Sequence, residues 1–336
     1  MDSLAAQSNM DFRVFFVNYG SRHELTGPLK ELLVQYEFVQ YSSYQVQHQP
    51  WNKCRALNNV IKELEVDYCL VADIDMIFHP QFVQRLHELA SPSRATYFQV
   101  GFLPEGETET AKGFSDYKIA HKSTDQATGI TLFPVEALRK IRGYDEFYHF
   151  WGAEDTDVHI RLHNMGLEVV FYDDQLLMLH QWHPIYRSHD ENKLSEDLRV
   201  ESVVRINHAY MKQLKLVGDR QVNAKGWGEI MEHDWELKSN EAVRIPNYRE
   251  EIDAFLIGTL PQLPPGIYYF EFYPQDEPAV KRKLKQLAGK KVLPLMEMKV
   301  INDRLLMELI SHHRHRAYSV KVDNQANKIH FSIQIP

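Results

Sequence analysis

The sequence has few cysteines, no long apolar run and no excess of positive charge. Its two cysteines, Cys54 and Cys69, stand in apolar or helix-like sequence, which fits small core residues in a reducing compartment better than a disulfide framework. No stretch approaches the roughly 18 consecutive apolar residues that a membrane-spanning helix needs. The first residues lack the basic and apolar segments of a secretory signal. We therefore expect a soluble enzyme, either bacterial or cytosolic, in the cytoplasm.

The charge balance excludes one broad class of partner. The chain has 46 acidic and 38 basic residues, for a formal net charge of −8. Broad nucleic-acid binding needs a basic surface that contacts phosphates, so no nucleic-acid partner is expected. At roughly 150 residues per domain, the 336 residues predict about two folded units.

The first 180 residues alternate short β-rich segments with amphipathic segments, which is typical of an α/β sheet flanked by helices. In the helix expected over residues 52–65, the apolar side chains repeat at helical spacing and face the sheet, leaving Lys53, Arg55 and Asn58 to face outward or towards a ligand. Strands are predicted at 13–18, 38–44, 68–72, 95–100, 128–133 and 167–172. Further helices are predicted at 24–36, from about 134, from Glu154 and over 192–216. Prolines and new strands at 268–273 and 328–335 indicate a second, smaller α+β unit.

Two carboxylates follow the strand predicted at 68–72. Open α/β sheets bind ligands at the carboxyl ends of their strands, which is where Asp73 and Asp75 stand. In an extended segment both carboxylates point to one side while Ile74 anchors the core, an arrangement that suits a divalent cation. A polar turn after a strand explains the same three residues about equally well.

Two further clusters follow along the chain. Acids at the helix start, Glu154, Asp155 and Asp157, are favoured by the helix dipole and by capping, by ~0.3–1 kcal/mol each, which accounts for one or two of them. Trp151 and Gly152 just before them offer a flat apolar wall beside a carboxylate, a combination that suits a sugar. His180 and His183 can place an imidazole on a metal, although a single histidine is more often structural.

The order of these clusters resembles that of the GT-A glycosyltransferases, most closely the β1,4-galactosyltransferase family. Residues 51–58 (WNKCRALN) are similar to its aromatic-Asn-Arg-Ala-Lys-Leu-Leu-Asn segment with Lys and Arg exchanged, and residues 73–75 match its Asp-Val-Asp. Residues 143–145 and 151–157 resemble its Gly-Tyr/Phe-Pro-Asn and Trp-Gly-Gly-Glu-Asp-Asp-Asp segments, and residues 180–183 fall where it has Met-Ile-Arg-His. Polypeptide N-acetylgalactosaminyltransferases and chondroitin polymerase-type enzymes are more distantly similar. The resemblance covers about residues 11–190.

The resemblance implies a role for each matching residue. Asp75 and His183 are expected to ligate the metal, with His180 as a further ligand in place of a methionine. Asp155 is implied as the catalytic base, and Trp151, Glu154 and Asp155 as acceptor-binding residues. The expected donor-binding residues are Asn18, Lys53, Arg55, Asn58, Asp73, Ile74 and Trp151. Ala153 and Thr156 depart from the family pattern, which leaves the acceptor open.

The expected activity follows from these roles. It is the metal-dependent, inverting transfer of a hexose, galactose or N-acetylgalactosamine, from a UDP-sugar to a hydroxyl of a glycan or lipid-linked saccharide. Mn²⁺ or Mg²⁺ suits the mixed ligands. Residues 1–240 are expected to form the GT-A catalytic domain and residues 241–336 an accessory α+β domain. Two alternatives are a catalytically silent nucleotide-sugar or glycan-binding protein and a phosphatase of the haloacid dehalogenase type, although Asp73–Asp75 follows a third strand rather than a first.

A basic segment lies in the second unit. Residues 281–316 contain ten Lys or Arg and three acidic residues. Such a run is usually a solvated face. The alternative is peripheral contact with an anionic surface, such as the inner membrane carrying a lipid-linked acceptor.

Overall fold

The computed structural model describes residues 1–110, 112–184, 192–218, 222–232, 241–275 and 279–336. Its N-terminal part is a mixed α/β layer with a central sheet in the order β3 (Tyr68–Val71), β8 (Thr131–Pro134), β5 (Arg94–Phe98) and β9 (Glu168–Tyr172). Strand β8 runs antiparallel to both neighbours, whereas β5 and β9 are parallel. A separate parallel pair, β1 (Val14–Tyr19) and β2 (Val39–Tyr44), is connected by α2 (His23–Leu33).

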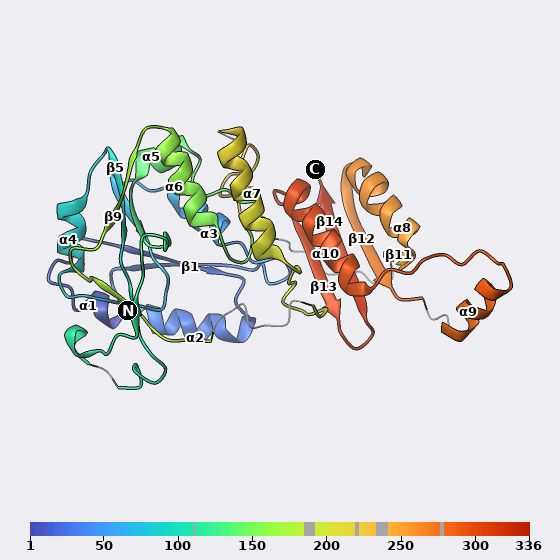
Figure 1. The fold of residues 1–336 in the computed structure, drawn as a ribbon, viewed down its shortest axis with the longest axis horizontal. Helices are drawn as coiled ribbons and strands as arrows, with labels where there is room; N and C mark the ends of the chain where they lie inside the picture. The colour runs from blue at the N-terminus through green and yellow to red at the C-terminus, as the bar shows by residue number, and fades with distance from the viewer. Residues whose placement is uncertain (111, 185–191, 219–221, 233–240, 276–278) are drawn as a thin grey trace.

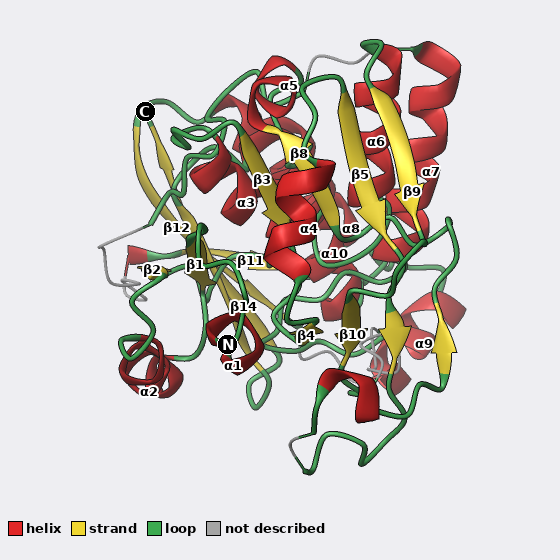
Figure 2. Ribbon diagram, turned by 90° about the vertical axis from the view of Figure 1, so that its left-hand side faces the viewer, coloured by secondary structure: helices red, strands yellow, loops and turns green. Residues whose placement is uncertain are grey.

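Helices cover both faces of the central sheet because its strands alternate apolar side chains between the two sides (Figure 2). Phe133 packs with the helices α3 (Lys53–Ile61), α5 (Val135–Lys140) and α6 (Glu154–Asn164). Its neighbour Leu132 packs on the other side with Phe82 and Val83 of α4 (Phe82–Leu89). Helix α7 (Val203–Val217) packs beside α6. The short helix α1 (Asp2–Ala5) lies near the N-terminus.

A smaller sheet lies beyond the end of β3. Its order is β4 (Met76–Phe78), β10 (Met178–His180), β6 (Gly101–Phe102) and β7 (His121–Lys122), with a 3₁₀ turn at Phe114–Asp116 before β7. Strands β4 and β10 are antiparallel, and His180 stands opposite Met76. This pairing joins chain segments about 100 residues apart immediately beside Asp73–Asp75.

The C-terminal unit is a four-stranded sheet with helices against it (Figure 1). Its strand order is β11 (Val243–Pro246), β12 (Gly266–Tyr273), β14 (Lys328–Ile335) and β13 (Tyr318–Asp323). Helix α8 (Arg249–Asp253) continues through a π-helical segment (Ala254–Thr259) into a 3₁₀ turn (Leu260–Gln262), and α10 (Met298–Glu308) ends in a π-helical turn (Leu309–His313). Helix α9 (Ala279–Leu287) projects from this unit on an extended arm.

The two parts of the molecule contact one another through the loop between β2 and α3. The Val320 amide of β13 donates to the His48 carbonyl (2.8 Å), and the Gln49 side chain donates to the Tyr318 carbonyl (3.1 Å). The core of the C-terminal sheet also includes Phe150 and Leu198 from the N-terminal part. The loop that leads into α3 is therefore held by the C-terminal sheet.

The expected mixed sheet flanked by helices is confirmed, as are the first-unit strands and the helix that begins at Glu154. The helix expected over 192–216 is wrong in its first half: α7 begins at Val203, because Leu198 (φ 52°) and Ser202 (φ 61°) adopt left-handed backbone that a helix cannot contain. The domain boundary at 240/241 stays a prediction and borders residues outside the described chain. Among the described residues, no helix is long and apolar enough to cross a membrane.

Candidate active site

Three potential metal ligands meet where β4 and β10 pair. The Gln181 amide donates to the Asp75 carbonyl (2.9 Å), which extends the β4–β10 ladder by one step. The Nε2 atoms of His180 and His183 lie 3.3 Å and 3.2 Å from Asp75 Oδ2. One possible ligand atom from each residue lies within 4.8 Å of the other two. The structure thus brings together all three residues expected to bind the metal.

This cluster fits a divalent cation. Asp75 Oδ1 is buried and has no hydrogen-bond partner, although burying an unsatisfied oxygen costs free energy. A bound cation would supply the missing interaction. One carboxylate and two imidazoles suit a divalent transition metal better than Mg²⁺, which prefers oxygen ligands.

A second cluster is centred on Lys53, the first residue of α3. Its Nζ lies 3.3 Å from Asp73 Oδ1, 3.7 Å from Glu154 Oε1 and 3.7 Å from Asp155 Oδ2. The Asn52 side chain caps α3 by accepting a hydrogen bond from the Arg55 amide (2.8 Å), which fixes the start of the helix. One lysine therefore joins the beginnings of α3 and α6 to the carboxyl end of β3.

Burial and charge act in opposite directions on this cluster. Burial lowers the pKa of Lys53, but Asp155, Asp73 and Glu154 outweigh it, so the net pKa is raised and the ammonium stays charged. Burial raises the pKa of Asp155 well above the ordinary aspartate value; Lys53 opposes the shift, and the neighbouring carboxylates Glu154 and Asp73 add to it. Asp155 Oδ1 is also buried without a hydrogen-bond partner. A partly desolvated carboxyl with a raised pKa has the properties of a proton acceptor.

The chain enters α6 through a strained turn. Phe150 (φ 63°) and Ala153 (φ 74°) both adopt left-handed backbone, which favours glycine. The Asn207 side chain of α7 holds this turn by donating to the carbonyls of His149 (3.0 Å) and Trp151 (3.1 Å). Ala153 is one of the two departures from the family pattern, and it occupies the residue just before Glu154. The turn sets the direction in which α6 presents its first acids.

Exposed tryptophans accompany both clusters. Trp151 is 42% exposed, and the Phe150 amide next to it donates to the Trp51 carbonyl (2.9 Å). Trp51 and Trp182 are exposed to a similar degree and were not among the expected site residues. Trp51 belongs to the motif at residues 51–58, and Trp182 to the motif at residues 180–183. An indole inside a charged motif was therefore the sequence signal that could have identified these two residues.

Three expected donor-binding residues lie in the interior. The Arg55 Nε bonds the Glu146 carboxylate (2.9 Å), and the Asn58 side chain donates to Glu146 Oε1 (3.0 Å) and to the Tyr144 carbonyl (2.8 Å). Asn18, at the end of β1, donates to the Tyr41 hydroxyl (3.0 Å). All three side chains are nearly fully buried and are held by the protein itself. The structure places all three in the framework behind the site, and their assignment to donor binding stays a prediction.

The expectation for Ile74 as a core anchor is also wrong. Its side chain is 84% exposed, because β3 ends at Val71 and Ile74 and Asp75 form a turn in which strand alternation no longer applies. Asp73 and Asp75 accordingly have different neighbours: Asp73 contacts Lys53, whereas Asp75 contacts the histidines. An exposed Ile74 between them remains available to a ligand.

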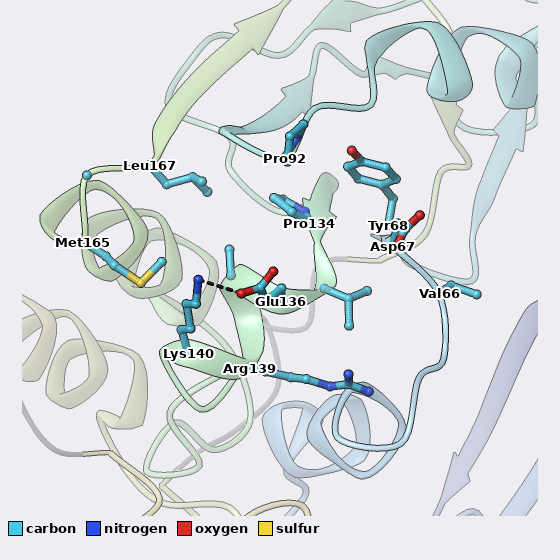
Figure 3. A pocket seen from close by; sticks show the side chains of 13 residues that line it. Val66, Asp67, Tyr68, Pro92, Pro134, Glu136, Arg139, Lys140, Met165 and Leu167 are labelled. Carbon is cyan, nitrogen blue, oxygen red and sulfur yellow. Dashed lines mark ion pairs between the residues drawn. The ribbon is translucent and has the colours of Figure 1, made fainter.

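A cavity that the structure shows lies elsewhere. It has a volume of about 730 Å³ and opens between the start of β3, the start of α5 and the end of α6 (Figure 3). Tyr68 and Pro134 line it, and Glu136 pairs with Lys140 (2.7 Å) across its wall. Because Tyr68 begins β3 and Asp73 follows its end, this cavity lies at the opposite end of the strand. None of the expected site residues lines it.

A buried histidine behind the site predicts acid sensitivity. Burial lowers the pKa of His149 to about 3, and the neutral ring accepts a hydrogen bond from Asn52 and donates one to the Phe147 carbonyl. The unfolded chain, with a pKa of about 6.5, binds the proton first, so this contribution to stability is present above about pH 6.5 and declines as the pH falls towards 3. We expect about 2 kcal/mol of unfolding free energy to be lost between pH ~7 and ~5 through this one residue.

Urea unfolding at the two pH values measures this loss. His149→Gln should lower stability at neutral pH but flatten its pH dependence, whereas the exposed control His23→Gln should keep the wild-type slope. An unchanged slope in His149→Gln would show that other groups cause the acid sensitivity.

Comparisons with known proteins find the N-terminal part similar to sugar-transferring enzymes. Residues 1–137 match the family model described as glycosyl transferase family 2, and residues 108–185 match one described as the N-terminal domain of galactosyltransferase. The human chondroitin sulfate synthase 3 is 28% identical over 124 residues, which cover 35% of this chain and 14% of the relative. The mouse beta-1,4-galactosyltransferase 5 is 28% identical over 163 residues, covering 46% of this chain and 38% of the relative. The chain therefore spans well under half the length of these relatives.

Solved structures give more distant similarities. A crystal structure of GalNAc-T7 with UDP, GalNAc and Mn²⁺ has a TM-score of 0.46 and 11% identity, and the match covers 63% of this chain and 44% of that one. A Drosophila beta-1,4-galactosyltransferase 7 with manganese, UDP-Gal and xylobiose has a TM-score of 0.34 and 14% identity, covering 66% and 85%.

Proposed function

We propose that the protein is a metal-dependent, inverting glycosyltransferase, because its N-terminal part matches the family models described as glycosyl transferase family 2 and the N-terminal domain of galactosyltransferase. It moves a hexose from a UDP-sugar to a hydroxyl of a glycan or lipid-linked acceptor. The observation that carries this proposal is the pair of neighbouring clusters at the end of β3, one with metal-ligand geometry and one with a partly desolvated carboxylate.

The metal-ligand cluster serves the donor side. Asp75, His180 and His183 would hold Mn²⁺, which supplies positive charge to the diphosphate as it leaves. Lys53 adds an ammonium within 3.3 Å of Asp73, so a nucleotide that contacts Asp73 also comes near a fixed positive charge. The exposed Ile74 lies between the two clusters and contributes an apolar contact to the donor.

The acidic end of α6 serves the acceptor side. Asp155 accepts the proton of the attacking hydroxyl, and one direct displacement inverts the anomeric configuration. Glu154 beside it binds hydroxyls, and the exposed indole of Trp151 packs against the apolar face of a sugar ring. Lys53, within 3.7 Å of both carboxylates, opposes the rise in the pKa of Asp155 and so favours its ionised form.

A donor panel tests the identity of the sugar. The relatives are named for galactose transfer and chondroitin synthesis, so UDP-galactose and UDP-N-acetylgalactosamine are the expected donors. Radiolabelled UDP-galactose, UDP-N-acetylgalactosamine, UDP-glucose and GDP-mannose are offered in turn with Mn²⁺, and both transfer and slow hydrolysis of the donor are scored. Hydrolysis makes the assay independent of the unknown acceptor. Exclusive use of the GDP-sugar would contradict the proposal.

A catalytically silent binding protein is the alternative that the same residues allow. It predicts a rise in the thermal midpoint with UDP and Mn²⁺ but no release of UDP from any sugar donor. The two outcomes of the donor panel therefore separate the enzyme from the binding protein. A cytoplasmic location remains a further part of the proposal.

A further inference from the structure

Helix α9 carries an apolar stripe that faces away from the protein. Val280, Leu284 and Leu287 are 70%, 61% and 84% exposed. Their spacing of four and three residues places them on one side of the helix. In Figure 1 the helix stands at the end of an extended arm, beyond the C-terminal sheet. Three large apolar side chains on one exposed face indicate a surface that is covered in use.

The opposite face of α9 is the one held by the protein. The Arg282 side chain donates a hydrogen bond to the Leu293 carbonyl on the returning arm (2.6 Å). At about 100° per residue, Arg282 lies roughly 140–160° around the helix from the three side chains of the apolar stripe. This bond therefore orients α9 with Val280, Leu284 and Leu287 pointing outward.

Positive charge flanks the stripe on both sides. Lys281 and Lys283 are exposed and lie at roughly 100° and 60° on either side of Val280. Lys290 and Lys291 follow the helix and are also exposed. Residues 279–291 contain six basic residues and no acidic one, in a chain whose net charge is −8.

The rest of the basic segment 281–316 does not form a comparable face. Lys299 is buried and pairs with Asp303, and Arg304 pairs with Asp253. The expectation of a basic face over the whole segment is thus corrected by these internal ion pairs. The exposed charge is concentrated around α9, together with the apolar stripe.

We propose that α9 docks on an anionic membrane surface, with its apolar stripe at the boundary between headgroups and acyl chains. A lipid bilayer accepts an apolar stripe flanked by lysines, because the lysine stems pack beside the acyl chains while the ammonium groups reach the phosphates. A partner whose charges are all negative is favoured, because residues 279–291 contain no acidic residue that could pair with a basic group on the partner. This inference goes beyond the transferase activity and does not rest on it.

Vesicle co-sedimentation of the full chain tests the proposal. We expect binding to vesicles of equal parts phosphatidylcholine and phosphatidylglycerol at low salt, weaker binding at high salt, and none to phosphatidylcholine alone. Lys281→Gln with Lys283→Gln should weaken binding roughly fivefold for each lysine removed. Leu284→Ser with Leu287→Ser should abolish binding even at low salt, since charge alone does not insert the helix.

Matched controls separate docking from general effects. Leu216→Ser with Val217→Ser removes two equally exposed apolar side chains at the end of α7 and should leave vesicle binding unchanged. All variants should keep the wild-type thermal midpoint, because every altered side chain is exposed. Wild-type failure to bind anionic vesicles, or full binding by the Leu284/Leu287 variant, would overturn the proposal. So would a dimer that Leu284→Ser dissociates without any vesicle binding, because the stripe would then join two copies of the chain.

Discussion

Asp155→Asn is expected to reduce turnover by roughly 10²–10⁴ while leaving the thermal midpoint near that of the wild type. Asparagine keeps the size of the side chain and a carbonyl oxygen near Lys53, but it cannot take up the proton of the acceptor hydroxyl. A residue that merely favoured the start of α6 would give the opposite result, with altered stability and normal turnover. Steady-state turnover together with thermal unfolding measures both quantities.

Glu154→Gln is the matched comparison, because Glu154 and Asp155 lie at the same 3.7 Å from the Lys53 ammonium. Its turnover should fall less than that of Asp155→Asn. If the asparagine variant kept wild-type turnover, Glu154 would become the next candidate for the base. Burial raises the pKa of Asp155, and the base must be ionised, so kcat/KM should fall on the acid side at a pH above that of an ordinary aspartate.

Asp75→Asn is expected to remove almost all activity and metal-dependent nucleotide binding. The amide carries no charge and is a poorer ligand for a divalent cation than the carboxylate, and Asp75 is the only carboxylate among the three clustered ligands. Removing the cation from the wild type with excess EDTA should have the same effect, and Mn²⁺ should restore activity only to the wild type. Full transfer activity in EDTA would eliminate the metal-dependent mechanism.

A thermal-shift experiment gives a readout that does not depend on turnover. UDP with Mn²⁺ should raise the midpoint of the wild type by several degrees and that of Asp75→Asn very little, because only a ligand bound to the native state stabilises it. The exposed acid Asp174, after β9, provides the control: Asp174→Asn should retain the full shift. Equal shifts in all three proteins would place the cation elsewhere.

The fold was largely predictable because local pattern and tertiary burial agree. Apolar alternation marks the central strands, and acids at the start of α6 agree with the helix dipole, so that Glu154 is both the predicted and the observed first residue. The start of α7 was not predictable because the residues just before Val203 are of types that a helix also accommodates. The left-handed backbone of Ser202 has no signal in its residue type, because serine does not require a positive φ.

The site was predictable only in part, for a similar reason. Helical periodicity places apolar residues on the buried face but says nothing of a polar residue whose partner is distant. Arg55 is buried because Glu146, 91 residues away, supplies a carboxylate inside the core. Sequence motifs identify Asp75, His180 and His183 as candidate metal ligands. The β4–β10 pairing that brings them together is a long-range contact, which the spacing of the motifs does not specify.

The hydrogen bonds between β13 and the loop before α3 bear on how such a protein evolves. Val320 and Tyr318 hold His48 and Gln49, only a few residues before Lys53. The C-terminal sheet thus supports the segment that carries a charged site residue, although it contributes no side chain to the two clusters. Recombination that exchanged this sheet for an unrelated one would displace Lys53 as well as the accessory unit. Selection on the transfer reaction would therefore act on both halves of the chain together, and their sequences should change in concert rather than as exchangeable modules.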